Sequence, residues 1–600
     1  MFPSFKPATQ PQTLGDLFRA TVGKYPHKPA LFFKDDGKYR HHTWGEIRRH
    51  VDGIRTFLGK QGMVLGDRIA ILSENRPEWA LIDLAAQLMG LATVPIYPSL
   101  TPPEIQYILR DSAAKMLAVS NKSLLEKIPP IQKMLPDLKI ILGFDASLKI
   151  HQRELSIPLC LLSECTKLSP DLHESTGGRA VQSGDLASII YTSGTTGPPK
   201  GVMLTHDNFV QNVLRCKDTL KMSSSDVHLS FLPLCHVFER MAGHYLMIHI
   251  GASIIYAETM ETVPLNILEG RPTFLLGVPR FFEKVQHRVT EKMAQGPAAK
   301  RELFDWAKGL RQKKRSGQSW TWNEFLLSPL ASFLVYRQFR AGLGGRLRFC
   351  VSGGAPLAKE IAEFFYDLGV MIYEGYGLTE TSPVISVNTQ EKVRFGSVGV
   401  PLPGVEVKLS EEGEILTKSP CVMKGYLNKE HETREALKDG WFYTGDLGRF
   451  DAEGFLFITG RKKELIVTSG GKKISPCPIE DELQKDPYLL RCVLNGEGKK
   501  FITALVVPNK DALMEYAERN KIAFKDYEDL LKERVIYEFL DQRIQELMKD
   551  FASYEKIKYF ALVSRDFTQE AGELTPTLKI KRDVVLARYR NVLEALYPRE

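Results

Sequence analysis

The sequence predicts an α/β fold, in which a large N-terminal domain of layered α/β sheets plus a small β-barrel is followed by a small α+β C-terminal domain. Apolar runs alternate with amphipathic stretches up to about residue 395. Glycine and proline then separate short alternating strands, and a charged segment with its own strand and helix begins near residue 460. We therefore expect domains at 1–460 and 461–600, with the barrel-like part at about 396–460.

Apolar runs of four to eight residues mark the expected strands of the large domain. Examples are residues 68–72, 187–191 and 274–278. Because helical patterns separate these runs, they indicate largely parallel sheets covered by helices. Residues 358–368 have helical periodicity, and 370–373 follow as a strand. Polar residues and a proline interrupt the most apolar stretch, 81–97, which predicts a buried helix and a strand instead of a membrane span.

The barrel-like part is predicted from alternating strands such as 405–409, which glycines and prolines separate. The last segment contains a strand at 502–507, a long charged helix at about 527–549 and a basic tail. We place the main domain boundary at residues 460–463.

The composition is that of a soluble globular protein, because 43% of the 600 residues are hydrophobic and 25% are charged. None of the eight cysteines forms a CxxC pair or has zinc-site spacing, which predicts reduced thiols. Residues 1–7 lack the basic start and apolar run of a signal peptide, so we expect a cytoplasmic protein. The net charge of +8 is mild for this length and does not predict nucleic-acid binding.

The most informative run is residues 191–201, which follows an apolar strand. Its three glycines allow close backbone approach to a ligand, and its hydroxyls, N–H groups and lysine suit a triphosphate. The run is not a Walker A loop, because two prolines precede Lys200 and no hydroxyl follows it. The predicted ATP-binding residues here are Thr192, Ser193, Gly194, Thr195, Thr196, Gly197 and Lys200.

This run resembles the signature of the adenylate-forming superfamily, which comprises acyl-CoA synthetases, luciferases and peptide-synthetase adenylation domains. Further motifs match in the family's order at 352–356, 376–381, 443–448 and 460–464. The resemblance covers essentially the whole chain and implies two half-reactions. A carboxylate attacks the α-phosphate of ATP and pyrophosphate leaves; a thiol then attacks the acyl-adenylate and AMP leaves.

The resemblance implies a role for each motif residue in binding ATP. Glu380 would hold Mg²⁺ and Thr379 would contact the α-phosphate. Tyr376, followed by Gly377, would stack on adenine, with Gly354, Ala355 and Pro356 on the other side. Asp446 would accept hydrogen bonds from the ribose hydroxyls, and Arg461 would contact ribose or phosphate.

Two more residues are expected to be catalytic by resemblance. His236 would lie beside the reacting carboxylate, although a lone histidine among apolar residues is more often a core residue. Lys579 would be the C-terminal catalytic lysine; Leu578 replaces the glycine of the family's Gly-Lys pair, which leaves Lys581 as an alternative.

The resemblance also implies that the C-terminal domain is mobile. Lys463 occupies the position of the hinge about which relatives rotate this domain between the two half-reactions. Ser469, Gly470 and Gly471 would then face the pantetheine arm in a thiol channel.

More than 60 residues separate residue 280 from residue 345, which resembles the insertion of long-chain fatty acid–CoA ligases. We expect ATP-dependent ligation of a long-chain fatty acid to coenzyme A. Acyl carrier protein as the thiol acceptor is the alternative, and a non-catalytic fatty-acid or nucleotide carrier is a remote one.

The insertion contains a basic cluster with aromatic residues nearby, comprising Lys300, Arg301, Lys308, Arg311, Lys313, Lys314 and Arg315. Such a cluster suits either an anionic membrane surface or a solvated helix face. Peripheral contact with the inner face of the membrane is therefore one of two open interpretations.

Overall fold

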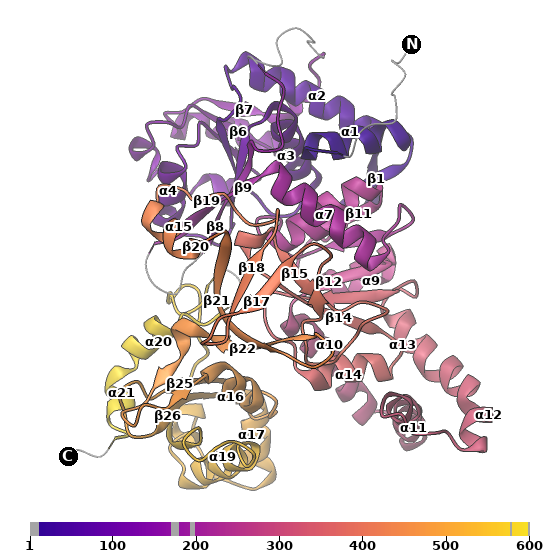
Figure 1. Ribbon diagram of the computed structural model, residues 1–600, viewed down its shortest axis with the longest axis vertical. Coiled ribbons are helices and arrows are strands. Elements are labelled where there is room, and N and C mark those ends of the chain that lie inside the picture. The colour runs from indigo at the N-terminus through magenta and orange to yellow at the C-terminus, as the bar shows by residue number, and fades with distance from the viewer. Residues whose placement is uncertain (1–10, 170–178, 193–197, 576–578, 598–600) are drawn as a thin grey trace.

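The computed structural model describes residues 11–169, 179–192, 198–575 and 579–597. Two large sheets with helices packed around them form the N-terminal part, and a smaller C-terminal domain lies below it in Figure 1. The chain is thus a mixed α/β protein with a large N-terminal and a small C-terminal domain, as the sequence predicts.

The first large sheet has eight strands in the order β19-β9-β8-β4-β3-β5-β6-β7. Strands β3 to β7 pair in parallel, whereas β8 and β9 form an antiparallel hairpin. Strands β4 and β5 are buried throughout, as expected for parallel strands covered on both faces. The bounds are β3 Arg68–Leu72, β4 Ala92–Ile96, β5 Met116–Val119, β6 Ile140–Gly143, β7 Leu159–Leu161, β8 Leu186–Thr192, β9 Lys200–Thr205 and β19 Gly425–Tyr426.

The second large sheet has nine strands in the order β16-β15-β14-β13-β12-β10-β11-β1-β2. Its central strands are parallel, and antiparallel strands flank them at both edges. The carboxyl ends of β13 and β14 lead directly into two of the predicted site motifs. The bounds are β1 Pro29–Asp35, β2 Lys38–Thr43, β10 Val227–Ser230, β11 Ser253–Tyr256, β12 Phe274–Gly277, β13 Phe349–Ser352, β14 Met371–Gly377, β15 Val384–Val387 and β16 Val400–Pro401.

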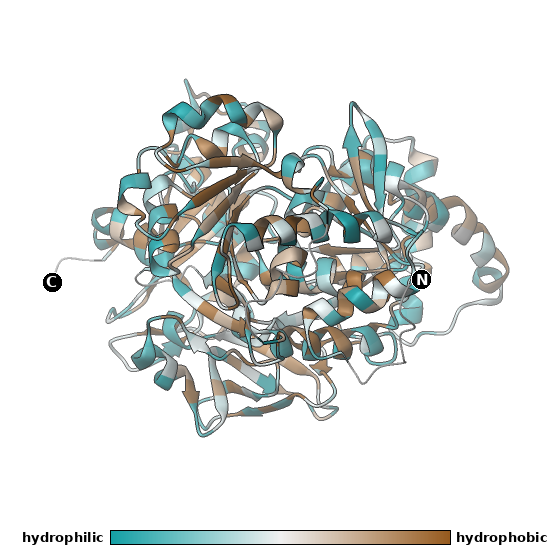
Figure 2. Ribbon diagram, turned by 90° about the horizontal axis from the view of Figure 1, so that it is seen from above, coloured by the Kyte–Doolittle hydropathy of each residue, from teal (hydrophilic) through white to brown (hydrophobic). Residues whose placement is uncertain are grey.

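Most helices of the N-terminal domain share a hydrophobic core with both large sheets, whereas α4 and α5 pack in a second core against the eight-stranded sheet. Figure 2 shows apolar strands inside and hydrophilic helix faces outside. Local sequence sets their ends: Thr43 and Thr205 cap α2 and α7, and Gly90 ends α3 with φ 71°. The bounds are α1 Leu14–Lys24, α2 Trp44–Lys60, α3 Pro77–Met89, α4 Pro102–Asp111, α5 Lys122–Leu125, α6 Leu162–Cys165, α7 His206–Leu220, α8 Leu246–Ile250, α9 Val263–Gly270, α10 Pro279–Ala294, α11 Ala298–Arg315, α12 Trp322–Ala331, α13 Arg337–Gly342, α14 Lys359–Asp367 and α15 Glu430–Ala436.

The region expected to be barrel-like contains a five-stranded antiparallel sheet. Two of its short strands, β16 and β19, pair instead with the large sheets, so this region is joined to both. The bounds are β17 Glu406–Leu409, β18 Glu414–Lys418, β20 Leu437–Lys438, β21 Trp441–Phe450 and β22 Leu456–Arg461.

The C-terminal domain has a three-stranded sheet, a two-stranded hairpin and helices with cores of their own. Its strands are β23 Ile466–Val467, β24 Lys473–Ile474, β25 Leu489–Asn495, β26 Ile502–Pro508 and β27 Ile557–Leu562. Its helices are α16 Pro476–Leu483, α17 Lys510–Arg519, α18 Tyr527–Leu530, α19 Arg534–Leu547, α20 Arg582–Arg588 and α21 Arg590–Glu594.

The single long helix expected at about 527–549 is wrong, because α18 and α19 replace it. Ile536, Leu540 and Ile544 are buried at every fourth position of α19, and Leu530 is also buried. In one continuous helix, the six residues from Leu530 to Ile536 would rotate by about 600° and turn Leu530 away from that face. The turn between the two helices allows both faces to reach the same core.

Candidate active site

The predicted phosphate loop connects β8 to β9, and Thr192 is the register partner of Lys200 at the base of that hairpin. Ser193, Gly194, Thr195, Thr196 and Gly197 lie outside the described residues. The Lys200 ammonium lies 5.0 Å from the centroid of the Tyr426 ring. One end of the expected triphosphate cradle is therefore fixed by strand pairing.

The loop after β13 offers bare backbone to a flat ligand. Gly354, Ala355 and Pro356 are exposed, and Gly354 has φ 84°, which disfavours a side chain. A Cβ at the preceding Gly353 would lie 3.3 Å from the ring of Phe238, so this glycine also allows close packing. The exposed backbone suits the face of an adenine ring.

Asp446 is held by two neighbours from different sheets. The Tyr376 hydroxyl donates to its Oδ2 at 2.8 Å, and Nε of Arg461 pairs with its Oδ1 at 2.8 Å. The Asp446 carboxylate raises the pKa of Arg461, and burial raises the pKa of Tyr376. Gly377 follows, where a Cβ would come within 1.8 Å of the Pro383 carbonyl oxygen.

Glu380 lies in the short helix η5 (Thr379–Thr381), directly after Thr379. The Tyr426 hydroxyl donates to its Oε1 at 2.9 Å, and burial raises the pKa of the carboxyl group. Sequence reasoning missed Tyr426, which is 46 residues away along the chain. Tyr426 reaches the site because β19 pairs with β9 beside Lys200.

His236 lies between β10 and the π-helix η3 (Glu239–Tyr245), and its Nδ1 accepts from the backbone N–H of Phe238 at 3.2 Å. Burial, with a further contribution from the Lys579 ammonium, lowers the pKa of His236 to about 4. His236 is therefore neutral at physiological pH, and the charge of Lys579 acts on it.

Lys579 reaches this site from the C-terminal domain. Its N–H donates to Oγ1 of Thr575 at 3.0 Å, and its carbonyl accepts from the Thr575 N–H at 2.8 Å. Although Lys579 keeps contact with solvent, desolvation by the surrounding protein and the charge of Arg461 lower its pKa, and Asp446 opposes that effect. Lys581, the alternative lysine, forms the N-cap of α20 instead.

Two family models together match most of the chain. Residues 18–427 match the model described as AMP-binding enzyme, and residues 463–600 match the AMP-binding enzyme C-terminal domain. The chain belongs to the AMP-binding enzyme family. The resemblance seen in the sequence motifs is thereby confirmed.

Curated relatives of this AMP-binding enzyme align over nearly its full length. The long-chain-fatty-acid–CoA ligase FadD15 of Mycobacterium bovis is 34% identical, over 97% of this chain and 98% of the relative. The human long-chain-fatty-acid–CoA ligase ACSBG1 is 31% identical, over 98% of this chain and 85% of the relative.

Solved structures share the fold of this AMP-binding enzyme at lower identity. The anthranilate CoA ligase AuaEII in complex with anthranoyl-AMP has a TM-score of 0.72 and 22% identity, covering 98% and 99% of the two chains. ATP-bound MatB from Rhodopseudomonas palustris has a TM-score of 0.70 and 24% identity, covering 97% and 99%.

The residues expected to act in the thiol step of this AMP-binding enzyme are exposed and lie at the start of the C-terminal domain. Lys463 is exposed in the short helix η6 (Lys462–Glu464), directly after β22. Ser469, Gly470 and Gly471 form an exposed turn between β23 and β24, where the Ser469 N–H donates to the Lys499 carbonyl at 2.9 Å. This turn thus contacts its own domain, while Lys579 lies near the Asp446–Arg461 pair.

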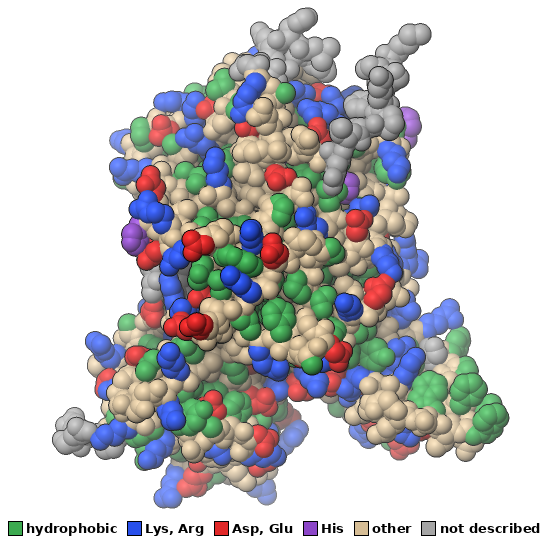
Figure 3. Space-filling view, viewed as in Figure 1, with side chains coloured by type: hydrophobic (Ala, Val, Ile, Leu, Met, Phe, Trp, Pro, Cys, Tyr) green, Lys and Arg blue, Asp and Glu red, His purple; other side chains and the backbone are tan. Residues whose placement is uncertain are grey.

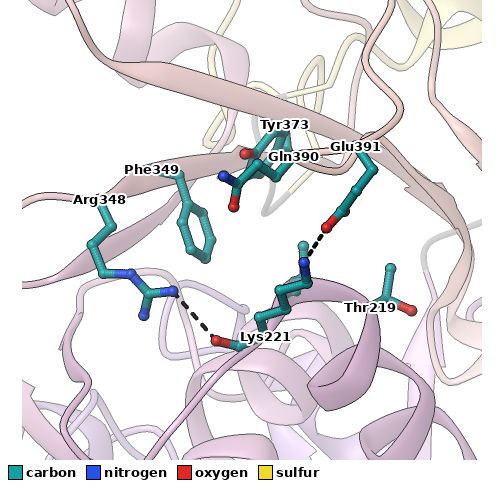
Figure 4. Close-up of a pocket in the computed structure, with 8 residues that line it drawn as sticks. Thr219, Lys221, Arg348, Phe349, Tyr373, Gln390 and Glu391 are labelled. Carbon is teal, nitrogen blue, oxygen red and sulfur yellow. Dashed lines mark hydrogen bonds and ion pairs between the residues drawn. The ribbon is translucent and has the colours of Figure 1, made fainter.

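A polar pocket lies near the amino end of β13 in the nine-stranded sheet, away from the carboxyl end that leads into the candidate site (Figure 4). Its lining includes Phe349, the first residue of β13, whereas the candidate site follows the last residue of that strand. Lys221 pairs with Glu391 across the pocket, and Arg348 donates to the Lys221 carbonyl at 3.3 Å. The pocket is therefore separate from the AMP-binding enzyme's candidate site.

Proposed function

We propose that this AMP-binding enzyme joins a long-chain fatty acid to coenzyme A through an acyl-adenylate, consuming ATP and releasing AMP and pyrophosphate. The observation that carries the proposal is that Lys579, from the C-terminal domain, lies near enough for its charge to act on His236 and on the Asp446–Arg461 pair that joins β21 to β22. The choice of a long-chain fatty acid and coenzyme A as substrates is supported by relatives that align over nearly the whole chain and are named long-chain-fatty-acid–CoA ligases.

The chemistry requires a carboxylate to approach an anionic phosphate, which positive charge must offset. Lys579 provides such charge from the C-terminal domain, and Arg461 provides it from the end of β22, at the boundary between the domains. Neutral His236 offers a polar contact beside the carboxylate with no charge of its own. The Asp446 carboxylate, oriented by Tyr376 and Arg461, is placed to accept hydrogen bonds from a ribose.

The residues around Glu380 fit Mg²⁺. This ion commonly binds one or two protein carboxylates and takes its other ligands from waters and substrate phosphates. Glu380 supplies one such carboxylate, with Oε1 oriented by Tyr426. Across the described parts of the chain, no group of three or more His, Cys, Asp or Glu could enclose a metal. When bound with ATP, Mg²⁺ would supply positive charge at the phosphates.

The proposal includes peripheral contact with the inner face of the membrane, because long-chain fatty acids partition into bilayers. Among the described residues, none of the helices has the length and apolarity needed to cross a bilayer. Coenzyme A and acyl carrier protein carry the same phosphopantetheine thiol, and competition between them would identify the acceptor. Nothing in the site favours a non-catalytic carrier.

A chain-length series tests the function. With ATP and coenzyme A present, pyrophosphate release and thioester formation are measured for acids from acetate to stearate. Each CH₂ buried in an acyl tunnel contributes about 0.8 kcal/mol, so kcat/KM should rise about fourfold per CH₂ until the tunnel ends. Similar kcat/KM values for acetate and palmitate would overturn the long-chain assignment.

A further inference from the structure

Helix α12 and the π-helix η4 (Ser332–Tyr336) project from the body of the enzyme on α11 (Figure 1). Figure 3 shows hydrophobic side chains gathered at the tip of this projecting lobe, at the lower right of the view. Six large apolar side chains are between 46% and 74% exposed there: Trp322, Phe325, Leu326, Leu327, Leu330 and Phe333. We call these six residues the apolar face of α12–η4.

The apolar face follows the helical repeat. Trp322, Leu326, Leu330 and Phe333 recur at intervals of four, four and three residues, so they lie along one side of a helix. No charged residue occurs between Glu324 and Arg337 in the sequence. Contiguous exposed apolar surface of this kind indicates an interaction site, whereas single exposed apolar residues do not.

Specific contacts on the opposite side hold the apolar face outward. Lys313 of α11 pairs with Glu324 at 2.5 Å, and the Trp320 indole N–H donates to the Leu310 carbonyl at 2.9 Å. The Tyr336 hydroxyl donates to the Ala307 carbonyl at 2.5 Å. The lobe is thus anchored to α11 through Glu324, Tyr336 and the Trp320 indole before α12, while the six residues of the apolar face stay in solvent.

The basic cluster on α11 is less available to a partner than its sequence suggests. Arg315 pairs with Glu363 at 2.5 Å and with Asp367 at 3.3 Å, and Lys313 pairs with Glu324. These acidic partners neutralise two cations that the sequence offers to an anionic membrane.

Two further cations of the cluster, Lys308 and Arg311, lie over aromatic rings of the protein itself. Lys300, Arg301 and Lys314 remain exposed at the two ends of α11. Arg337 is also exposed, and its guanidinium lies 5.3 Å from the centroid of the Phe333 ring, beside the apolar face.

We propose that the apolar face of α12–η4 is a lipid-docking surface that inserts into the interfacial region of a bilayer. The proposal rests on the proposed function, because a long-chain fatty acid is concentrated in bilayers. Ten residues of α12 and five of η4 are too few to span a membrane, but they suit a helix lying in its plane.

The chemistry of the rim favours lipid over protein as the occupant. Arg337 lies over Phe333 at the edge of the apolar face and matches anionic headgroups, and Trp322 suits the level between headgroups and chains. The Ser328 hydroxyl donates to the Phe325 carbonyl at 2.9 Å, within the helix itself. Docking would also bring α14 near the bilayer, because Arg315 of α11 pairs with Glu363 of α14. Helix α14 follows the Gly354 loop of the candidate site.

The test is flotation of the full chain with vesicles of phosphatidylcholine and phosphatidylglycerol. The triple variant Phe325→Ser, Leu326→Ser, Phe333→Ser should lower the partition coefficient about tenfold or more, because apolar burial drives the interaction. The matched control Met260→Ser, Leu265→Ser, Leu268→Ser removes similarly exposed apolar side chains elsewhere and should bind as the parent does. Equal vesicle binding by the triple variant and the parent would overturn the proposal.

Two further measurements separate the alternatives. Light scattering reports the oligomeric state. If the parent is a dimer, the triple variant is a monomer and neither binds vesicles, the apolar face is covered by a second copy of the chain and the lipid proposal is overturned. Pyrophosphate release with octanoate and no vesicles should be equal in the parent and the triple variant. A parent that binds vesicles but activates no fatty acid refutes the proposed function and leaves the docking surface standing.

Discussion

Replacing Lys579 with alanine tests whether the C-terminal domain supplies charge to the first half-reaction only. The charges of Arg461 and Asp446 act on the pKa of Lys579, and the Lys579 ammonium acts on the pKa of His236, so these four residues lie near one another. Its backbone is held by two hydrogen bonds to Thr575. Alanine therefore removes the ammonium group and keeps the segment in place.

The expected loss can be estimated from the charges that remain. Deleting one group that stabilises a transition-state charge costs about 100- to 1,000-fold in rate, or about 2.7–4 kcal/mol. Arg461 remains as a second cation in the variant, so we expect about 100-fold, the lower end of that range. Thioester formation from supplied acyl-adenylate should change by less than about threefold, because that step needs no carboxylate–phosphate approach.

The two half-reactions are measured separately, as pyrophosphate release and as thioester formed from synthetic acyl-adenylate. Gly470→Leu is the complementary variant: a Cβ there meets only Oγ1 of Thr468 at 3.9 Å, so the fold accepts leucine while the thiol channel would not. Lys463→Pro, at the expected hinge, should also impair only the thiol step. If all three variants lose both half-reactions equally, alternation of the domains is refuted.

Three further predictions follow from the contacts described above. Tyr426→Phe removes a charge-assisted hydrogen bond to Glu380 that is worth about 1.5–3 kcal/mol. Half-maximal pyrophosphate release should therefore need at least about tenfold more Mg²⁺, and an unchanged Mg²⁺ requirement would contradict the role of Glu380. The pKa of Lys579 is lowered and its protonated form is required, so kcat/KM for ATP should fall as pH rises through that lowered pKa. Lys579→Arg should lose this alkaline fall. Identical pH profiles for the parent and the variant would contradict the role of the Lys579 ammonium. Asp83→Asn breaks a fully buried pair with Arg240 and should lower the free energy of unfolding by about 3–5 kcal/mol in urea titration, whereas a loss below about 1 kcal/mol would show that the pair is dispensable.

The sequence was sufficient for those parts of the site whose chemistry lies in one short segment. The phosphate-loop run and the motifs around Tyr376 and Asp446 each contain their own glycines and polar groups. The first two fall at the ends of β8 and β14, whereas Asp446 lies within β21. Strand ends were predictable because apolar runs of the observed length stop at these motifs. The family and the layered fold followed from their order along the chain.

Contacts between distant segments could not be predicted. Tyr426 contacts Glu380 only because β19 crosses to the eight-stranded sheet. Arg315 is neutralised by Glu363 and Asp367, which follow it by about 50 residues, so a count of local charges overestimates the exposed basic surface. In both cases a single sequence offers no signal of the pairing.

The arrangement of the site suggests why one lysine can act as a switch. The Thr192–Lys200 hairpin, Tyr376, and the Asp446–Arg461 pair belong to three sheets of the N-terminal domain, which strand pairing holds in place. Among the candidate ATP contacts, Arg461 ends the last strand before the domain boundary, and Lys579 lies within the other domain.

Polar contacts fasten that domain in this arrangement. Among the described residues they include the Lys485–Glu360 pair at 3.0 Å, the pairs of Lys462 with Glu412 and Glu414, and the Ser475 hydroxyl bonded to the Thr459 carbonyl at 2.9 Å. An exposed ion pair contributes only about 0–1 kcal/mol, which is small beside the binding energy of a nucleotide. A triphosphate that contacts both Lys579 and Arg461 would therefore hold the domains together, and departure of pyrophosphate would release that restraint. The order of the two half-reactions would then follow from which anion occupies the site.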